Sequence, residues 1–248
     1  MCLRGTESPI QGSAPCDQPC TLQEAQPMDH TVQILHTGFV THDVKQFIVT
    51  RPDDFQFEPG QGVELAVDEE GWHDEGRPFT PTSLPDEPVL EFTIKIYPDH
   101  EGVTRKLDTL NPGTSLLMSE AFGTIKYQGP GTFIAGGAGV TPFLAILRQL
   151  HEGGELDGSS LLFSNRTPAD VICEKELRHL LGDRCHLTCT GRSAPGYDDR
   201  RIDGAYLEEK VDDLDQHFYL CGPPAMVEDV QEALQELGVD AERTVLEE

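Results

Sequence analysis

The chain has 248 residues, of which 44 are Asp or Glu and 18 are Lys or Arg, so its formal charge is −26. This charge argues against binding to nucleic-acid backbones or to anionic membrane surfaces, because like charges repel as the partners approach. No run approaches the roughly 20 apolar residues that span a bilayer, and 37% hydrophobic residues suffice for a buried core. We therefore expect a cytoplasmic protein of one large or two modest domains.

The N-terminal residues 1–28 are rich in Pro, Gln, Ser and Cys and show no apolar periodicity. They also lack the apolar core of a signal peptide, which predicts a disordered extension, and Met28 offers an alternative start of the chain. Three of the seven cysteines lie here, and no Cys-x-x-Cys pair occurs anywhere in the chain. The cysteines therefore predict neither a disulfide framework nor a metal site.

From residue 31 to about residue 126, short apolar alternations are interrupted by Pro and Gly, which is typical of strands joined by turns. The expected strands cover residues 31–40, 45–50, 62–67, 89–97 and 114–119, and a short helix is expected near 104–110. Several short strands at this spacing predict an antiparallel barrel or sandwich.

After residues 128–131 (Gln-Gly-Pro-Gly), strands alternate with helices. The expected strands are 131–137, 159–165, 186–190 and 217–223, and the expected helices are 142–150, 174–181 and 224–237. This alternation predicts a parallel sheet with helices on both faces. The change of pattern divides the chain into a domain of residues 29–127 and a domain of residues 128–248.

A glycine turn at residues 136–139 connects an apolar strand to a helix, for which Thr141 is a suitable N-cap and Pro142 a suitable first residue. Small residues and free N–H groups at such a turn suit a diphosphate, although a glycine run that only packs tightly is an equally open interpretation. The turn is not G-x-G-x-x-G, and no acidic residue follows at the usual distance of about 20 residues. An ordinary Rossmann dehydrogenase is therefore disfavoured.

Four further segments accompany this turn: 77–83 (RPFTPTS), 94–97 (IKIY), 102–104 (GVT) and 221–226 (CGPPAM). In this order and spacing they resemble the ferredoxin–NADP reductase superfamily, with the nearer likeness to its cytochrome b5 reductase and flavohaemoglobin-reductase branches. The resemblance covers nearly everything from residue 31 to residue 246. It implies a Greek-key β-barrel that binds FAD, followed by an α/β domain with a parallel sheet that binds a nicotinamide dinucleotide.

In the barrel, the resemblance implies that Arg77 contacts the FAD diphosphate, that Phe79 stacks on the isoalloxazine, and that Thr80 lies near flavin N5 as a catalytic residue. Family members more often have Tyr at the position of Phe79. The other residues implied to bind FAD are Ile94, Lys95, Tyr97, Gly102, Val103 and Thr104. Three histidines, His36, His42 and His100, could lie near the flavin edge, but a structural or surface role is the simpler interpretation.

In the α/β domain, the resemblance implies that the dinucleotide diphosphate contacts Gly137, Gly139, Val140, Thr141 and Pro142. Cys221 is implied to lie beside the nicotinamide as a second catalytic residue, with Gly222 and Pro223 shaping the slot. Taken alone, Cys221 would be interpreted as a buried strand cysteine.

The choice of dinucleotide depends on Asn165 and Arg166, which follow the second strand where the adenosine ribose is expected. No acidic residue is present before Asp170 to hold a ribose diol, whereas Arg166, together with Arg192, suits a 2′-phosphate. The sequence therefore favours NADPH over NADH.

The resulting hypothesis is an FAD-dependent NAD(P)H oxidoreductase, in which hydride passes from the nicotinamide to the flavin and electrons pass on to a separate redox partner. No globin or ferredoxin-cluster segment accompanies these motifs, so we expect a soluble electron-acceptor protein or a small acceptor, and a monomeric reductase. The alternatives are the reductase component of a multicomponent oxygenase, a non-catalytic flavin- or nucleotide-binding regulatory module, and an NAD-dependent dehydrogenase without flavin.

Overall fold

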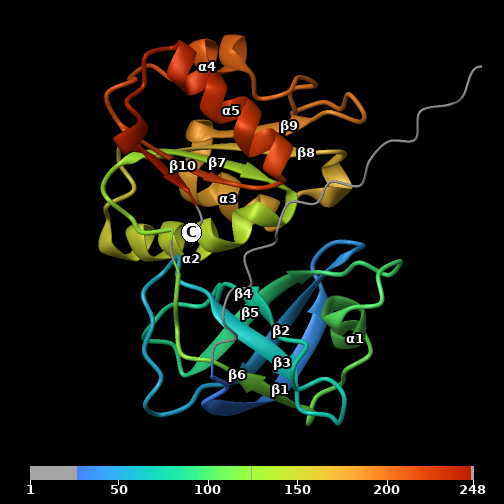
Figure 1. The fold of residues 1–248 in the computed structure, drawn as a ribbon. Helices are drawn as coiled ribbons and strands as arrows, with labels where there is room; N and C mark the ends of the chain where they lie inside the picture. Colours follow the sequence, from blue (N-terminus) through green and yellow to red (C-terminus); the bar gives the residue numbers. More distant parts are fainter. Residues whose placement is uncertain (1–26, 124, 247–248) are drawn as a thin grey trace, which may run out of the picture.

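A computed structural model of the chain describes residues 27–123 and 125–246. The predicted extension of residues 1–28 therefore lies almost wholly outside the described residues. The first half of the chain forms a β-barrel and the second half forms an α/β domain above it, coloured blue to green and green to red (Figure 1). Within the described ranges, no helix has the length and apolar character needed to cross a membrane.

Six antiparallel strands build the barrel, in the order β4-β3-β6-β1-β2-β5. The main chain closes it, because Pro81 pairs with Phe92 and the Thr82 N–H donates to the Glu91 carbonyl at 2.7 Å, which joins the two edge strands. The predicted barrel is thus confirmed. Its elements are β1 (His30–Phe39), β2 (Val44–Thr50), β3 (Val63–Val67), β4 (Arg77–Phe79), β5 (Val89–Lys95), α1 (Val103–Asp108) and β6 (Ser115–Met118).

Five parallel strands form the second sheet, in the order β11-β10-β7-β8-β9, as the alternation of strands and helices predicted. Two strand–helix units run outward from β7 on one side, and the later strands return to its other side. The elements are β7 (Gly131–Gly136), α2 (Thr141–Gly153), β8 (Ser160–Asn165), α3 (Glu174–Leu181), β9 (Cys185–Cys189), α4 (Gly204–Lys210), β10 (His217–Cys221), α5 (Pro224–Glu236) and β11 (Thr244–Leu246).

Helices cover both faces of this sheet, because successive side chains of a strand point to opposite sides. Phe133 and Ala135 of β7 belong to the apolar cluster with α2 and α3, whereas Ile134 belongs to the cluster with α4 and α5. Figure 1 shows the consequence: α2 lies on the side of the sheet that faces the barrel, and α4 and α5 lie on the far side.

The two domains touch through α2, and part of that contact is apolar. Val44 at the start of β2 and Ile125 after the barrel join the same buried cluster as Ile146 of α2, and both are about 1% exposed. The two halves therefore share a small core at their boundary.

Arg148 of α2 adds a polar contact between the domains. Its Nη1 donates to Glu91 Oε1 of β5 at 2.9 Å and to the Thr82 carbonyl at 2.5 Å. Its Nε and Nη2 donate to the carboxylate of Glu176 of α3 at 2.6 and 2.9 Å. Burial alone would lower the pKa of Arg148, but the hydrogen bonds and charges of Glu176 and Glu91 outweigh burial and raise it. Arg148 thus stays charged and ties α2 to both neighbours.

Candidate functional site

A cleft of about 1420 Å³ lies between the two domains. On the barrel side it is lined by the β1–β2 hairpin, by β4 and by the residues after β5. On the α/β side it is lined by the carboxyl ends of β7, β8 and β10 and by the loops and helix starts that follow them. Ligands of open parallel sheets bind where the strand order reverses, and here that point lies between β7 and β10.

A second interdomain cavity is smaller, about 470 Å³, and is lined by residues 125–127 at the end of the barrel domain and by α2. It contains none of the predicted site residues. The larger cleft is therefore the candidate site.

The glycine turn forms one wall of the cleft. After β7 the chain makes a single 3₁₀ turn, Gly137–Val140, before α2 begins. Val140 is the N-cap of α2, so the predicted capping role of Thr141 is wrong; its hydroxyl instead donates to the Ala138 carbonyl at 3.0 Å. Because of this 3₁₀ turn, α2 begins at Thr141, one residue before the predicted start at Pro142. The Thr-Pro sequence alone does not reveal the turn.

The glycines of this turn have different tasks. Gly137 has φ +54°, and a Cβ there would meet nothing within 4 Å, so the backbone is open to a ligand. A Cβ on Gly139 would lie 2.3 Å from the Cys221 carbonyl oxygen, so this glycine lets the turn pack on the end of β10. The glycine run therefore packs tightly at Gly139 and leaves the backbone open at Gly137, and the contact with a diphosphate stays a prediction.

Cys221 ends β10 next to the glycine turn and is 7% exposed. It lines the cleft together with Gly222 and Pro223, which separate the strand from α5. A Cβ on Gly222 would lie 3.0 Å from the Gly136 nitrogen, so only a glycine fits here without displacement of the backbone. The sequence CGPP thus brings a thiol to the switch point.

Asn165 lies at the end of β8 on the same wall and is 6% exposed. Neither its amide oxygen nor its amide nitrogen has a hydrogen-bond partner in the structure. A buried amide without partners is costly, so this residue is suited to a polar ligand. Arg166 follows at the surface, and Arg201 of the loop after β9 lines the same cleft.

On the barrel wall, Phe79 and Thr80 follow Pro78 at the end of β4, and Thr80 is 9% exposed. Lys95 ends β5, and its Nζ lies 2.9 Å from Asp43 Oδ2. Burial alone would raise the pKa of Asp43, but the hydrogen bond and charge of Lys95 outweigh burial and hold it below its ordinary value. Asp43 is therefore ionised at neutral pH.

The cleft brings together most of the predicted site residues from both domains, which lie far apart in the sequence. These are Phe79, Thr80, Lys95, Tyr97, Gly137, Gly139, Thr141, Pro142, Asn165, Arg166, Cys221, Gly222 and Pro223.

Six predicted residues do not line the cleft. Ile94, Val103 and Val140 point into the apolar cores and are at most 2% exposed. Arg77 lies on β4 with its side chain 55% exposed, 3.7 Å from Glu75. Gly102 and Thr104 lie at the start of α1, outside the lining residues. The predicted contact of Val140 with the dinucleotide and the predicted FAD contacts of the other five stay predictions.

Charged residues that sequence reasoning did not assign to the site also line the cleft. Arg201 and Asp229 come from the α/β domain, and neither belongs to a motif. Arg192, the predicted companion of Arg166, is not among the lining residues, whereas Arg201 is. Of the three histidines considered, only His42 reaches the cleft.

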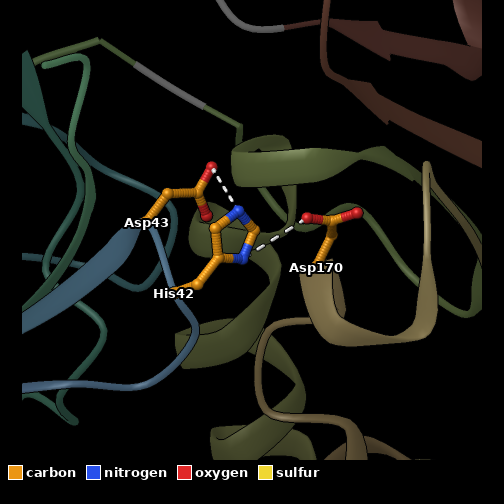
Figure 2. A group of neighbouring side chains, drawn as sticks. All are labelled: His42, Asp43 and Asp170. Carbon is orange, nitrogen blue, oxygen red and sulfur yellow. Dashed lines mark ion pairs between the residues drawn. The ribbon is translucent and has the colours of Figure 1, made fainter.

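His42 lies between two carboxylates, one from each domain (Figure 2). Its Nε2 is 3.8 Å from Asp43 Oδ2, and its Nδ1 is 3.7 Å from Asp170 Oδ1. One possible ligand atom from each of the three residues lies within 4.8 Å of the others, which is a spacing that could hold a metal ion. Lys95 already neutralises Asp43, however, and Thr167 occupies Asp170 Oδ2 with two hydrogen bonds of 2.7 Å, so we treat the group as ion pairs.

A barrel joined to a parallel sheet, with a cleft at the switch point, defines a two-domain nucleotide-binding protein. Comparison with known families identifies both domains: residues 31–127 match the Oxidoreductase FAD-binding domain, and residues 133–232 match the Oxidoreductase NAD-binding domain. The chain belongs to the ferredoxin–NADP reductase superfamily, as its motifs predicted. FAD and a nicotinamide dinucleotide, the predicted cofactors, are thus the ligands of its domains.

Curated relatives include the ferredoxin–NAD(P)+ reductase component of the naphthalene 1,2-dioxygenase system of Pseudomonas putida, 29% identical over 211 residues, which are 82% of this chain and 63% of that protein. NADH-cytochrome b5 reductase 1 of Aspergillus oryzae is 27% identical, over 83% of this chain and 78% of that protein. The chain thus spans about three fifths of the oxygenase-system relative.

Among solved structures, a ferredoxin NADP+ reductase from Neisseria gonorrhoeae with bound FAD and NADP superposes with a TM-score of 0.78 at 22% identity. The superposition covers 88% of this chain and 97% of that one. It shows that the two chains share one fold.

Proposed function

We propose that the chain is a flavin-dependent NAD(P)H oxidoreductase that passes electrons to a separate acceptor. One observation carries the proposal: a single cleft joins Phe79 and Thr80 of the FAD-binding domain to Cys221 and the glycine turn of the NAD-binding domain. Hydride transfer requires the two rings to meet, and this is where the two domains offer a common space.

The residues of the cleft have different roles, which follow from their chemistry. Phe79 supplies an aromatic face for a flat ring, and Thr80 supplies a hydroxyl beside it. Gly137 leaves backbone open for a diphosphate, and the small Cys221 side chain leaves room for a nicotinamide at the switch point. When bound, FAD supplies the capacity to accept two electrons together and release them singly.

For the dinucleotide we propose NADPH. Arg166 and Arg201 line the cleft beyond β8 and β9, and both can pair with a 2′-phosphate. Asp170, the only acidic residue close to Arg166 in the sequence, is not placed to hold a ribose diol: one oxygen accepts two hydrogen bonds from Thr167 and the other faces His42.

For the acceptor we propose a redox protein, with a small acceptor as the alternative. A second candidate function, reductase component of a multicomponent oxygenase, is favoured by the relative from the naphthalene dioxygenase system. The proposal also includes a monomeric state, a cytoplasmic location and a domain boundary between residues 127 and 128.

Anaerobic mixing of the FAD-loaded chain with NADPH or NADH tests the proposal. We expect the visible absorbance of the flavin to bleach, faster with NADPH, and to recover when a ferredoxin, cytochrome or dye acceptor is added. Phe79→Ala should weaken FAD binding about tenfold, since it removes an aromatic stacking contact. Phe39→Ala is the matched control, because Phe39 is 58% exposed and does not line the cleft.

Two outcomes would favour the alternatives. A chain that binds FAD but is not reduced by either dinucleotide would be a regulatory module. A chain that oxidises a substrate with NAD(P)+ but takes up no FAD would be a dehydrogenase without flavin.

A further inference from the structure

Asp229 is a charged residue of the cleft that the proposed reaction does not use. It lies in the second turn of α5 and lines the cleft together with Pro224, Ala225 and Met226. Among the described residues, its carboxylate has no ion pair and no hydrogen bond. A carboxylate repels the phosphates of FAD and of a dinucleotide, so this position suits a part of the ligand that carries no phosphate and donates hydrogen bonds.

The packing of α4 on α5 brings Asp229 and Arg201 to the same corner of the cleft. Val230 and Ala233 of α5 are buried in the apolar cluster that α4 shares. A Cβ added to Gly204, the first residue of α4, would lie 3.9 Å from the Ala233 Cβ, which is ordinary contact distance. Asp229 lies one turn before Ala233, and Arg201 lies three residues before Gly204. Both side chains therefore line the cleft at the junction of these two helices.

Apolar side chains complete this corner of the cleft. Ile202 is 5% exposed, and Met226 packs against the same apolar cluster; both line the cleft. The Met226 sulfur lies over the end of β7, because a Cβ added to Gly136 would be 2.5 Å from it. A thioether makes favourable contacts with an aromatic ring. The corner therefore offers an apolar surface to a flat ring, with the Asp229 carboxylate as a hydrogen-bond acceptor at its edge.

We propose that Asp229 determines the base specificity of the dinucleotide site, by accepting a hydrogen bond from the exocyclic amine of adenine. This inference rests on the proposed function, in which Arg166 and Arg201 hold the 2′-phosphate. The base is bonded to the same ribose as that phosphate, so a dinucleotide held by Arg201 has its base within reach of Met226 and Asp229. An ionised carboxylate only accepts hydrogen bonds, and the adenine amine donates them. Asp229 thus selects adenine over a base with a carbonyl at this position.

Dinucleotides with an altered base test the inference through binding alone. Calorimetric titration of the FAD-loaded full chain gives the Kd of NADP+ and of its deamino analogue, whose hypoxanthine has a carbonyl in place of the amine. We expect the wild type to bind NADP+ about three- to tenfold more tightly than the analogue, a modest ratio because Asp229 is exposed to solvent. The same preference is expected for NAD+ over deamino-NAD+, so the result does not depend on the 2′-phosphate.

Asp229→Asn should abolish this preference. An amide accepts a hydrogen bond from the adenine amine through its oxygen and donates one to the hypoxanthine carbonyl through its nitrogen, so we expect the two Kd values to become about equal. Glu228→Gln is the matched control, because it also removes one carboxylate from the same turn of α5, and Glu228 is exposed and does not line the cleft. Its ratio of Kd values should equal that of the wild type.

Three results would overturn the inference and leave the proposed function standing. The first is equal affinity of the wild type for NADP+ and its deamino analogue. The second is the same preference for adenine in Asp229→Asn as in the wild type. The third is a changed ratio of the Kd values for NADP+ and NAD+ in Asp229→Asn without a change in base preference, which would place the carboxylate against the 2′-phosphate. A chain that binds none of these dinucleotides would refute the proposed function together with the inference.

Discussion

Arg201 reaches the same cleft as Arg166, although 35 positions separate them in the sequence. A charge-assisted hydrogen bond to a phosphate is strong because the donor and acceptor are both ionised. We expect Arg166→Ala and Arg201→Ala each to lower the ratio of kcat/KM for NADPH to that for NADH by about 10- to 100-fold. Steady-state reduction of a dye acceptor with each dinucleotide gives this ratio.

Arg192→Ala is the control for both variants, because Arg192 is an exposed arginine of the same loop that does not line the cleft. Its ratio should equal that of the wild type. The assignment of these arginines to a 2′-phosphate would be wrong if the wild type preferred NADH and the ratio of kcat/KM values were the same in all three variants.

Single residues were predictable where a motif fixes the backbone around them. Gly137 and Cys221 are placed by a strand end and a tight turn, so the sequence located them correctly at the cleft. Arg201 and Asp229 come from a loop and a helix that carry no motif, and only the folded chain brings them to the cleft. Val140 follows Gly139 as the last residue of the 3₁₀ turn, yet it points into the core, because the turn rotates it away from the ligand side.

Among the elements, those with an apolar pattern were predicted, including the short β6 and α1, whereas β4, α4 and β11 were not. The residues predicted for α3 match its bounds, whereas α2, predicted over 142–150, runs on to Gly153 and is capped by Gly154, which has φ +70°. β4 has only three residues and contains Pro78, so no alternation could mark it. α4 has seven residues, of which Tyr206 and Leu207 are buried, and β11 has three; both are defined by tertiary packing.

Helix α2 holds the molecule together through Arg148, and this makes a prediction at the level of elements. Arg148→Ala leaves Glu91 and Glu176 without their common partner, and we expect it to lower the free energy of unfolding by about 2–4 kcal/mol. Because Arg148 links the domains, calorimetry should also show the single unfolding transition separate into two. Arg148→Lys should recover only part of the loss, since an ammonium cannot bind both carboxylates in the forked geometry.

Arg178→Ala provides the comparison. Arg178 pairs with Glu174 on the surface of α3, within one domain, and its loss should cost about 0.5 kcal/mol or less and leave one transition. An Arg148→Ala protein as stable as Arg178→Ala would show that the network contributes specificity of packing and little stability.

At the scale of the whole molecule, the charge of −26 acts against the compact state. Forty-four carboxylates repel one another over the surface, and only 18 basic residues offset them, several of which are committed to named pairs such as Arg148 with Glu91. The cleft in addition needs positive charge, because FAD and the dinucleotide are themselves anionic. Lys95, Arg166 and Arg201 line it together with Asp43, Asp99, Asp170 and Asp229, so the cleft is less acidic than the chain as a whole but carries no positive excess.

This balance predicts that salt stabilises the chain. Raising the ionic strength from about 0.01 M to about 0.5 M shortens the Debye length from about 30 Å to below 10 Å, which screens the surface repulsion but affects buried pairs less. We expect Tm to rise over this range, and to rise equally in NaCl and Na₂SO₄ at matched ionic strength, because screening depends on ionic strength alone. A larger rise in sulfate, continuing above about 1 M, would point to exclusion of the salt from the protein surface. A Tm that falls with salt would contradict this prediction, because it would mean that surface ion pairs stabilise the chain by more than the net charge destabilises it.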